Sequence, residues 1–340
     1  MSERWGGKVI FFPGRSPGAA ARLGRYVELL RCVPTSELAI KAAARLAARV
    51  APRLLPFPRY LHVEITNRCN MRCVMCPREQ MDRPTGLIDQ GLFRRIVDQA
   101  AQHANLIEGV ALMGLGEPLL HPQFVELTKL AADAGAPHLY TSTNAALLDQ
   151  AMARRLLESQ ALERIIFSLD GTKPETYEAI RRHGDFAAVT SNIRGFLAAK
   201  AACGASLPRT TLQILVMDST SDELEPFLEQ WVPLLGPTDD ILVKEVDTFG
   251  GQVEDRRVVD RTPAKRFACR QLYKDMSISW DGRVTVCCKD VLYRLEVGNV
   301  RDSTLEQLWR CAGWQRIREL HEQGRWDELT PCDGCNEWYL

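Results

Sequence analysis

Short apolar runs alternate with helical stretches through the middle of the chain. Six runs have the length and composition of buried strands, at residues 61–66, 107–113, 138–142, 163–168, 210–217 and 240–246. Stretches with the apolar spacing of amphipathic helices separate or follow them, at residues 89–103, 122–134, 146–157, 174–182, 185–202 and 221–235. Strands that alternate with helices form parallel βαβ units. Six such units predict an α/β fold, a partial (β/α)₆ barrel over residues 61–247.

Residues 1–60 differ from the barrel segment in charge. They hold eleven Lys and Arg against three acidic residues, and the run 36–50 predicts an Ala-rich helix. Lys41, Arg45 and Arg49 share one face of that helix because they are four residues apart. One interpretation is a solvated face on a helix that packs its alanines against the barrel. The other is a peripheral contact of this basic helix with an anionic membrane surface or an acidic protein.

Composition limits the partners and the location of the protein. The formal net charge of the 340 residues is zero, so no overall basic field favours nucleic acid. No apolar run reaches the roughly 18 residues that a membrane-spanning helix needs. The first residues lack the apolar core of a signal peptide, and eleven cysteines without a secretion signal favour metal or redox use over disulfides. We therefore expect a cytoplasmic protein without a transmembrane span.

Three cysteines lie within eight residues, directly after the first predicted strand. Cys69, Cys73 and Cys76 have C-x₃-C-x₂-C spacing, and thiolate is the ligand that iron–sulfur clusters use. Three thiols hold three irons of a [4Fe–4S] cubane and leave the fourth iron open to a small chelating ligand. The alternatives are a zinc site or a set of structural thiols. Zinc prefers four ligands in a closed site, and the nearest histidine, His62, lies in the preceding strand.

This loop resembles the cluster loop of the radical S-adenosylmethionine (SAM) superfamily, and the residues on both sides of the thiols, 66–70 and 75–77, match as well. The resemblance implies that the open iron binds SAM. It also implies that the reduced cluster cleaves SAM to a 5′-deoxyadenosyl radical, which takes a hydrogen atom from a substrate. A reductase such as flavodoxin or ferredoxin would supply the electron.

The ends of the following strands resemble the SAM-binding motifs of the same superfamily. The second strand ends in Gly116, Glu117 and Pro118, with Leu115 at the position of the family's first glycine. Flexible backbone at this place suits the SAM ammonium group. Further candidates follow the third to fifth strands: Asn144, Ser168 (a ribose contact), Asp170, Arg181 or Arg182 (a contact to the SAM carboxylate) and Met217 (beneath the adenine). For the arginine, the alternative is an exposed residue of a helix.

Three charged residues lie near the end of the sixth strand, Lys244, Glu245 and Asp247. The alternation of side chains along a strand directs Glu245 to the face opposite the other two. We expect these charges to contact a small polar substrate. The alternative is a pair of solvated loop charges.

A second set of cysteines follows a linker at residues 248–262. Residues 276–280 and 283–287 flank an Asp-Gly pair, which predicts a β-hairpin. The set comprises Cys269, Cys287, Cys332 and Cys335. Its spacing resembles the twitch form of the SPASM extension of radical SAM enzymes. The resemblance implies a small α+β domain over residues 263–340 with one auxiliary [4Fe–4S] cluster bound by all four thiols. The alternative is a four-cysteine zinc knuckle.

Two spare thiols of the C-terminal region, Cys288 and Cys311, are too few for a second four-thiolate cluster. A complete auxiliary cluster can still accept an electron, and the chain resembles the twitch-type aminocyclitol dehydrogenases. That resemblance implies oxidation of an alcohol of a sugar, cyclitol or other polyol to a ketone. Dehydration or epimerisation of a sugar and maturation of a ribosomal peptide stay open as alternatives. So does a non-catalytic iron–sulfur or zinc scaffold that binds a partner through its basic helix.

Overall fold

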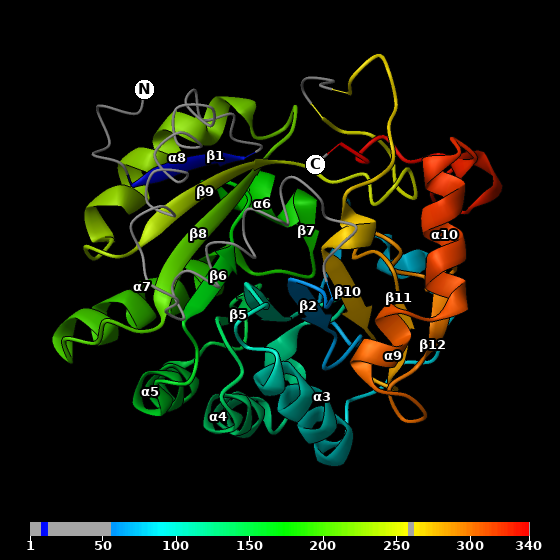
Figure 1. The fold of residues 1–340 in the computed structure, drawn as a ribbon. Coiled ribbons are helices and arrows are strands. Elements are labelled where there is room, and N and C mark those ends of the chain that lie inside the picture. Colours follow the sequence, from blue (N-terminus) through cyan, green and yellow to red (C-terminus); the bar gives the residue numbers. More distant parts are fainter. Residues whose placement is uncertain (1–7, 13–55, 258–261, 340) are drawn as a thin grey trace, which may run out of the picture.

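The computed structural model of the chain describes residues 8–12, 56–257 and 262–339. Its main element is one sheet of ten strands (Figure 1). From one edge to the other these are β1 (Val9–Phe12), β9 (Asp240–Glu245), β8 (Arg209–Val216), β6 (Arg164–Ser168), β5 (Leu139–Thr143), β4 (Gly109–Leu112), β2 (Tyr60–Val63), β10 (Asp275–Ile278), β11 (Arg283–Thr285) and β12 (Glu296–Asn299). The helix predicted over residues 36–50 lies outside the described residues.

The barrel consists of the six strands that the apolar runs predict, β2, β4, β5, β6, β8 and β9, and neighbouring strands pair in parallel. Six helices lie between these strands along the chain, two of them between β6 and β8, and they cover the outer side of the sheet (Figure 1). They are α3 (Gln90–Gln102), α4 (Phe124–Ala134), α5 (Gln150–Ser159), α6 (Pro174–Ile180), α7 (Phe186–Ala202) and α8 (Leu224–Trp231). The predicted partial (β/α)₆ barrel is confirmed.

Local signals explain why these helices begin where the sequence predicts. An aspartate precedes α3, α5 and α7, and its side chain accepts a hydrogen bond from a backbone N–H of the first turn. The inner faces of the helices are apolar: Phe93, Ile96 and Val97 of α3 are fully buried in the core. The core between helices and sheet therefore follows from the helical spacing of apolar residues.

Four strands extend the sheet beyond the six barrel strands, β1 on one side and β10, β11 and β12 on the other. At one edge, β1 pairs in parallel with β9, so residues 9–12 of the N-terminal segment belong to the sheet. Only a helix over residues 36–50 was predicted in this segment, and the strand at residues 9–12 was not identified from the sequence. At the other edge, β10 pairs in parallel with β2 (Figure 1). The C-terminal region is therefore joined to the barrel by continuous backbone hydrogen bonds.

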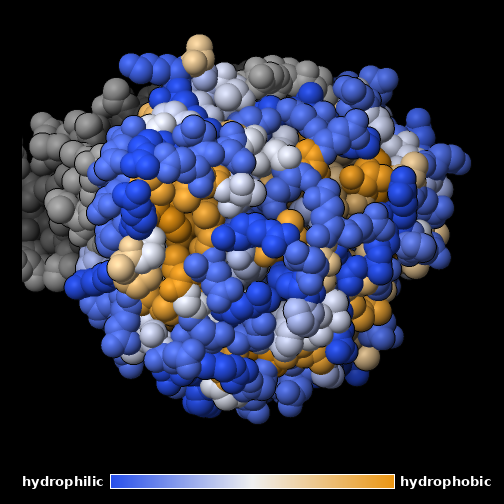
Figure 2. All heavy atoms as spheres, turned by 90° about the vertical axis from the view of Figure 1, so that its right-hand side faces the viewer, coloured by the Kyte–Doolittle hydropathy of each residue, from blue (hydrophilic) through white to orange (hydrophobic). Residues whose placement is uncertain are grey.

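The C-terminal region has the predicted hairpin and two helices. Strands β10 and β11 pair antiparallel, and Gly282 between them has a φ of +93°, which favours glycine. The helices are α9 (Leu305–Trp309) and α10 (Ala312–Glu322), and Trp309 packs on Trp314 with ring centroids 4.6 Å apart. Figure 2 shows this side of the molecule as mainly hydrophilic with separate apolar patches. Across the described ranges, no helix combines the length and apolarity that crossing a membrane requires.

Candidate functional site

Cys69, Cys73 and Cys76 lie half-buried in the loop after β2, and none forms a disulfide. Cys73 belongs to the short strand β3 (Arg72–Cys73), which pairs antiparallel with β7 (Arg181–Arg182). Burial raises the pKa of all three thiols, and it raises that of Cys76 to about 11. The charges of the other two cysteines add to the rise at Cys76, so the three sulfurs lie near one another. Three converging thiols fit three corners of an iron–sulfur cluster.

Arg181 is the buried arginine beside these thiols. Its Nη1 lies 3.8 Å from Sγ of Cys73, while its Nε and Nη2 donate to Oδ2 of Asp170 at 2.9 and 2.6 Å. The second carboxylate oxygen of Asp170 accepts from the backbone N–H of Leu215 at 2.8 Å. Asp170 therefore holds Arg181 against the cysteine loop. Arg182, the other candidate for the SAM carboxylate, is exposed.

Glu117 connects the ends of the second and third barrel strands. Its backbone N–H donates to the carbonyl oxygen of Arg68 at 2.8 Å, which ties the Gly116–Glu117 turn to the cysteine loop. Its buried carboxylate accepts from the hydroxyl of Thr143 at 2.6 Å and from the backbone N–H of Asn144 at 2.7 Å. The Glu117 side chain thus holds two loops together, and backbone atoms of this turn are the groups left to contact a ligand.

The other candidates for SAM contact lie around the same loop. The amide of Asn144 donates to Oδ1 of Asn70 at 2.9 Å, and Oγ of Ser168 lies 3.1 Å from Oγ of Ser142. Pro118 begins a 3₁₀ turn, Pro118–Leu120, and is buried. A small apolar cluster packs against Cys73 and comprises Met75, Ile180, Leu215, Met217 and Val246. The predicted residues from four strand ends are therefore gathered beside the three thiols, as side chains at the carboxyl ends of barrel strands are.

The charges at the end of β9 have protein partners. Lys244 forms an ion pair with Asp247, and Nζ of Lys289 lies 2.5 Å from Oδ1 of Asp247 and 3.9 Å from Oε1 of Glu337. Although burial alone raises the pKa of Asp247, the two lysines lower it well below its usual range. Asp247, paired with Lys244, thus connects the barrel to Lys289 of the C-terminal region. Glu245, the residue after Lys244, is half-buried.

The four cysteines of the C-terminal region converge from separate parts of the sequence. Burial raises the pKa of Cys269 to about 12, and the charges of Cys269 and Cys335 add to the rise that burial causes at Cys332. The charge of Cys269 also reaches Cys287. Two backbone N–H groups donate to these sulfurs. That of Lys289 lies 3.3 Å from Sγ of Cys287, and that of Glu337 lies 3.4 Å from Sγ of Cys335. Four free thiols with N–H donors fit a complete cluster.

Two family models match the chain. The model of the radical SAM superfamily matches residues 63–230, and that of SPASM, an iron–sulfur cluster-binding domain, matches residues 269–336. The first range contains the three thiols of the loop, and the second contains the four thiols of the C-terminal region. The chain belongs to the radical SAM superfamily and carries a C-terminal SPASM domain. SAM and iron–sulfur clusters are therefore the cofactors of this radical SAM enzyme.

Relatives of this radical SAM enzyme share moderate sequence identity with it. An uncharacterised protein of Treponema pallidum is 25% identical, over 92% of this chain and 87% of the relative. The tungsten-containing aldehyde ferredoxin oxidoreductase cofactor-modifying protein of Pyrococcus furiosus is 26% identical, over 82% of this chain and 89% of the relative. The GTP 3′,8-cyclase of Geobacter sulfurreducens is 33% identical over 48% of each chain.

Solved structures share the fold. SuiB of Streptococcus suis bound to precursor peptide SuiA has a TM-score of 0.66 at 14% identity, over 93% of this chain and 82% of SuiB. BtrN in complex with AdoMet and 2-DOIA has a TM-score of 0.57 at 15% identity, over 83% of this chain and 94% of BtrN. At such identities the likeness establishes the fold of this radical SAM enzyme.

A buried ion pair at the site escaped the sequence reasoning. Nη1 and Nη2 of Arg83 each donate to a different carboxylate oxygen of Glu64, both at 2.6 Å. Oε2 of Glu64 also accepts from the backbone N–H of Leu115 at 3.2 Å. The pair joins the first barrel strand to the loop that carries Gly116. An acidic residue inside an apolar run was the available signal, because such a residue needs a partner when buried.

Proposed function

We propose that this radical SAM enzyme oxidises an alcohol of a small sugar, cyclitol or other polyol to a ketone. The observation that carries the proposal is the single set of four cysteines in the SPASM domain, which leaves its cluster closed to direct substrate binding. When bound, SAM and the cluster of the cysteine loop supply a radical that removes a hydrogen atom from carbon. The substrate would then lose one proton and one electron to become a ketone, and a cluster held by the four SPASM cysteines would supply the acceptor for that electron.

The positions of the other cysteines support one auxiliary cluster. Sγ of Cys311 accepts from the backbone N–H of Trp314 and caps α10, while Cys203 is exposed at the end of α7. Sγ of Cys288 lies 3.8 Å from a carboxylate oxygen of Asp275. In the described ranges these thiols do not form a second four-cysteine set. One closed auxiliary cluster is therefore expected, and such a cluster can act on the substrate only by electron transfer.

The inner face of the barrel supports a polar substrate. Strand registers place His62, Ala111, Tyr140 and Arg164 at one level across four neighbouring strands. These residues lie on the face opposite Leu61, which packs in the core with the helices. His62 and Tyr140 are polar groups of this level that suit a hydroxylated molecule, whereas Arg164 is already bonded to Thr211 and Asp240.

Maturation of a peptide is the second candidate. It is favoured by the similarity to SuiB, which was crystallised with a precursor peptide and has the higher TM-score of the two structures compared above. The two candidates separate experimentally, because peptide maturation predicts turnover with peptides and none with polyols.

The electron-acceptor role is tested with the Cys332→Ala/Cys335→Ala double variant. We expect a folded variant to cleave SAM and release 5′-deoxyadenosine, yet to form little ketone, because the substrate radical has lost its electron acceptor. Both products are measured in one reaction, with Cys203→Ala as the control for loss of a thiol outside either set. A ratio of ketone to 5′-deoxyadenosine equal to that of the wild type would contradict the dehydrogenase mechanism and favour a redox-neutral dehydration or epimerisation.

A further inference from the structure

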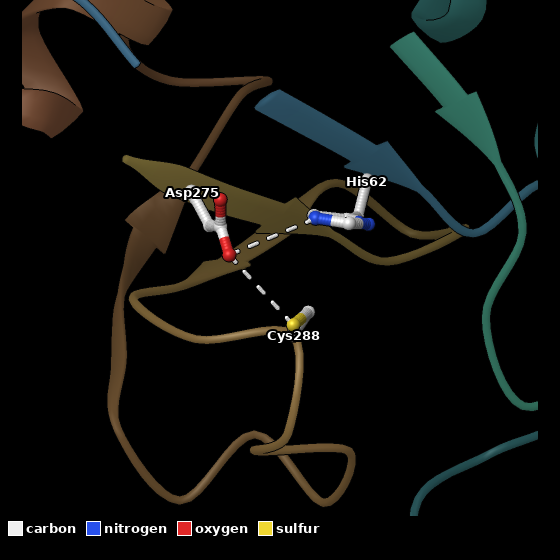
Figure 3. Close-up of side chains that lie close together, drawn as sticks. All are labelled: His62, Asp275 and Cys288. Atoms are coloured by element: carbon white, nitrogen blue, oxygen red, sulfur yellow. Dashed lines mark hydrogen bonds and ion pairs between the residues drawn. The ribbon is translucent and has the colours of Figure 1, made fainter. Parts of the chain in front are cut away.

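Three potential metal ligands from separate elements meet where the SPASM hairpin joins the barrel. His62 lies on β2, Asp275 on the neighbouring β10, and Cys288 in the loop after β11 (Figure 3). Oδ2 of Asp275 lies 4.0 Å from Nε2 of His62 and 3.8 Å from Sγ of Cys288. One ligand atom from each residue lies within 4.8 Å of the others. Figure 3 shows the three side chains directed toward one another.

The polar groups here have few protein partners. Asp275 is 5% exposed, and among the described residues its carboxylate oxygens have only the thiol and the imidazole as side-chain partners. An ionised carboxylate accepts up to about four hydrogen bonds, so the site leaves most of this capacity unused. Ser277 is the next residue on the same face of β10 and pairs with His62 across the sheet. Its hydroxyl is buried and has no hydrogen-bond partner within the described part of the chain.

We propose that His62, Asp275 and Cys288 bind one divalent cation of borderline softness, for which Zn²⁺ is the probe. One nitrogen, one oxygen and one sulfur ligand suit zinc. Bonds of about 2.0 to 2.3 Å in a tetrahedral site separate ligand atoms by about 3.3 to 3.6 Å. The observed 3.8 and 4.0 Å exceed these separations by less than an ångström, and the third pair, His62 and Cys288, lies within 4.8 Å, so side-chain rotations must bring the three ligand atoms closer together. A thiolate and a carboxylate also neutralise the dication in this buried place.

The site differs from both cysteine sets in its donors and its open position. Cys288 contacts Cys287 of the auxiliary set, so the cation would lie beside the auxiliary cluster. With three protein ligands it would keep a fourth position for water or another oxygen, as catalytic zinc sites do. If the substrate is an alcohol, as the proposed function holds, its oxygen at this fourth position would lose its proton more readily. That assignment of the fourth ligand depends on the proposed activity, whereas metal binding by the three residues does not.

The test is metal analysis of the full chain with its clusters assembled, without substrate. Zinc and iron per chain are measured after equilibration with Zn²⁺ and gel filtration, for the wild type, His62→Gln, Asp275→Asn and Cys288→Ser. His138→Gln is the matched control, because His138 is exposed and pairs with Glu163. We expect about one zinc beside about eight irons in the wild type and the control. Each site variant should keep its iron and bind zinc about tenfold or more weakly.

The proposal is overturned if zinc per chain is the same in the site variants and in His138→Gln. It is also overturned if Cys288→Ser loses about four irons and no zinc, because Cys288 would then be a ligand of the auxiliary cluster. X-ray absorption at the zinc edge supplies a second readout: one sulfur among nitrogen and oxygen neighbours supports the site, and four sulfurs contradict it. Since these measurements need no substrate, their failure leaves the dehydrogenase proposal untouched, and a failure of that proposal leaves the zinc result standing.

Discussion

Replacing Gly116 by alanine tests the contact between the strand-end turn and the cysteine loop. A Cβ at this position would lie 2.1 Å from the carbonyl oxygen of Thr66 and 2.7 Å from that of Arg68. Ordinary contacts of a Cβ begin near 3.4 Å, so the turn must move by more than an ångström. Both obstacles are backbone atoms, which cannot rotate aside. The movement would also break the hydrogen bond from Glu117 N–H to the Arg68 carbonyl, now 2.8 Å long.

The expected cost follows from these two contributions. Overpacking against a closely packed backbone costs about 1–3 kcal/mol, and a buried hydrogen bond left unmade costs about 1–3 kcal/mol. Together they lower the free energy of unfolding by about 2–6 kcal/mol. Gly195 in α7 is the matched control, because a Cβ there would meet no atom within 4 Å. Gly195→Ala should stabilise the protein by about 0.5–1 kcal/mol, since alanine is the better helix former.

Both variants are compared with the wild type by anaerobic urea unfolding and by SAM titration. We expect Gly116→Ala to have a lower midpoint, weakened SAM binding and little SAM cleavage, while the four thiols of the SPASM domain still bind their share of iron. Gly195→Ala should match the wild type in SAM binding. The reasoning is refuted if Gly116→Ala keeps the wild-type midpoint and SAM affinity, or if Gly195→Ala loses as much stability as Gly116→Ala.

Two further variants test single side chains of the site. Ser168→Ala should weaken SAM binding by about 1 kcal/mol, the usual net value of one hydrogen bond, without a change in iron content; an unaltered affinity in the titration would remove Ser168 from the site. Asp170→Asn leaves the buried guanidinium of Arg181 without its anion and should lower the free energy of unfolding by about 3–5 kcal/mol. Urea unfolding measures this loss, and a midpoint equal to that of the wild type would contradict the role assigned to the pair.

The barrel could be predicted from the sequence because its signals are local. Apolar runs and helical spacing locate the six barrel strands and the helices between them, and capping aspartates mark where three helices begin. The two strands that flank the barrel, β1 and β10, could not be placed in the same way. Residues 9–12 are a short apolar run whose partner, β9, lies more than 200 residues further along the chain. The Asp-Gly pair indicates the β10–β11 hairpin, yet nothing local indicates that β10 also pairs with β2.

The same difference between local and distant signals explains which parts of the candidate site could be predicted. The spacing of Cys69, Cys73 and Cys76 is a local pattern, and the four thiols of the C-terminal region were identified by the resemblance of their spacing to the SPASM extension. Which of two neighbouring arginines faces Cys73 depends on the two-residue pairing of β3 with β7, and no sequence period marks such a pairing. Lys244 and Asp247 were expected to contact substrate, whereas their nearest partners are each other and Lys289. A charge at a strand end does not disclose a partner in another part of the chain.

Three consecutive residues in the loop after β11 have different partners. Cys287 belongs to the four-thiol set, Cys288 contacts Asp275 where β10 joins the barrel, and Lys289 pairs with Asp247 after β9. Strands β9 and β10 lie on opposite flanks of the barrel strands in the sheet order. The loop therefore spans the open side of the barrel and fixes the auxiliary thiols relative to both flanks. Because side chains of one short segment make these contacts, a displacement of the loop would disturb the auxiliary thiols and the His62–Asp275 pair together.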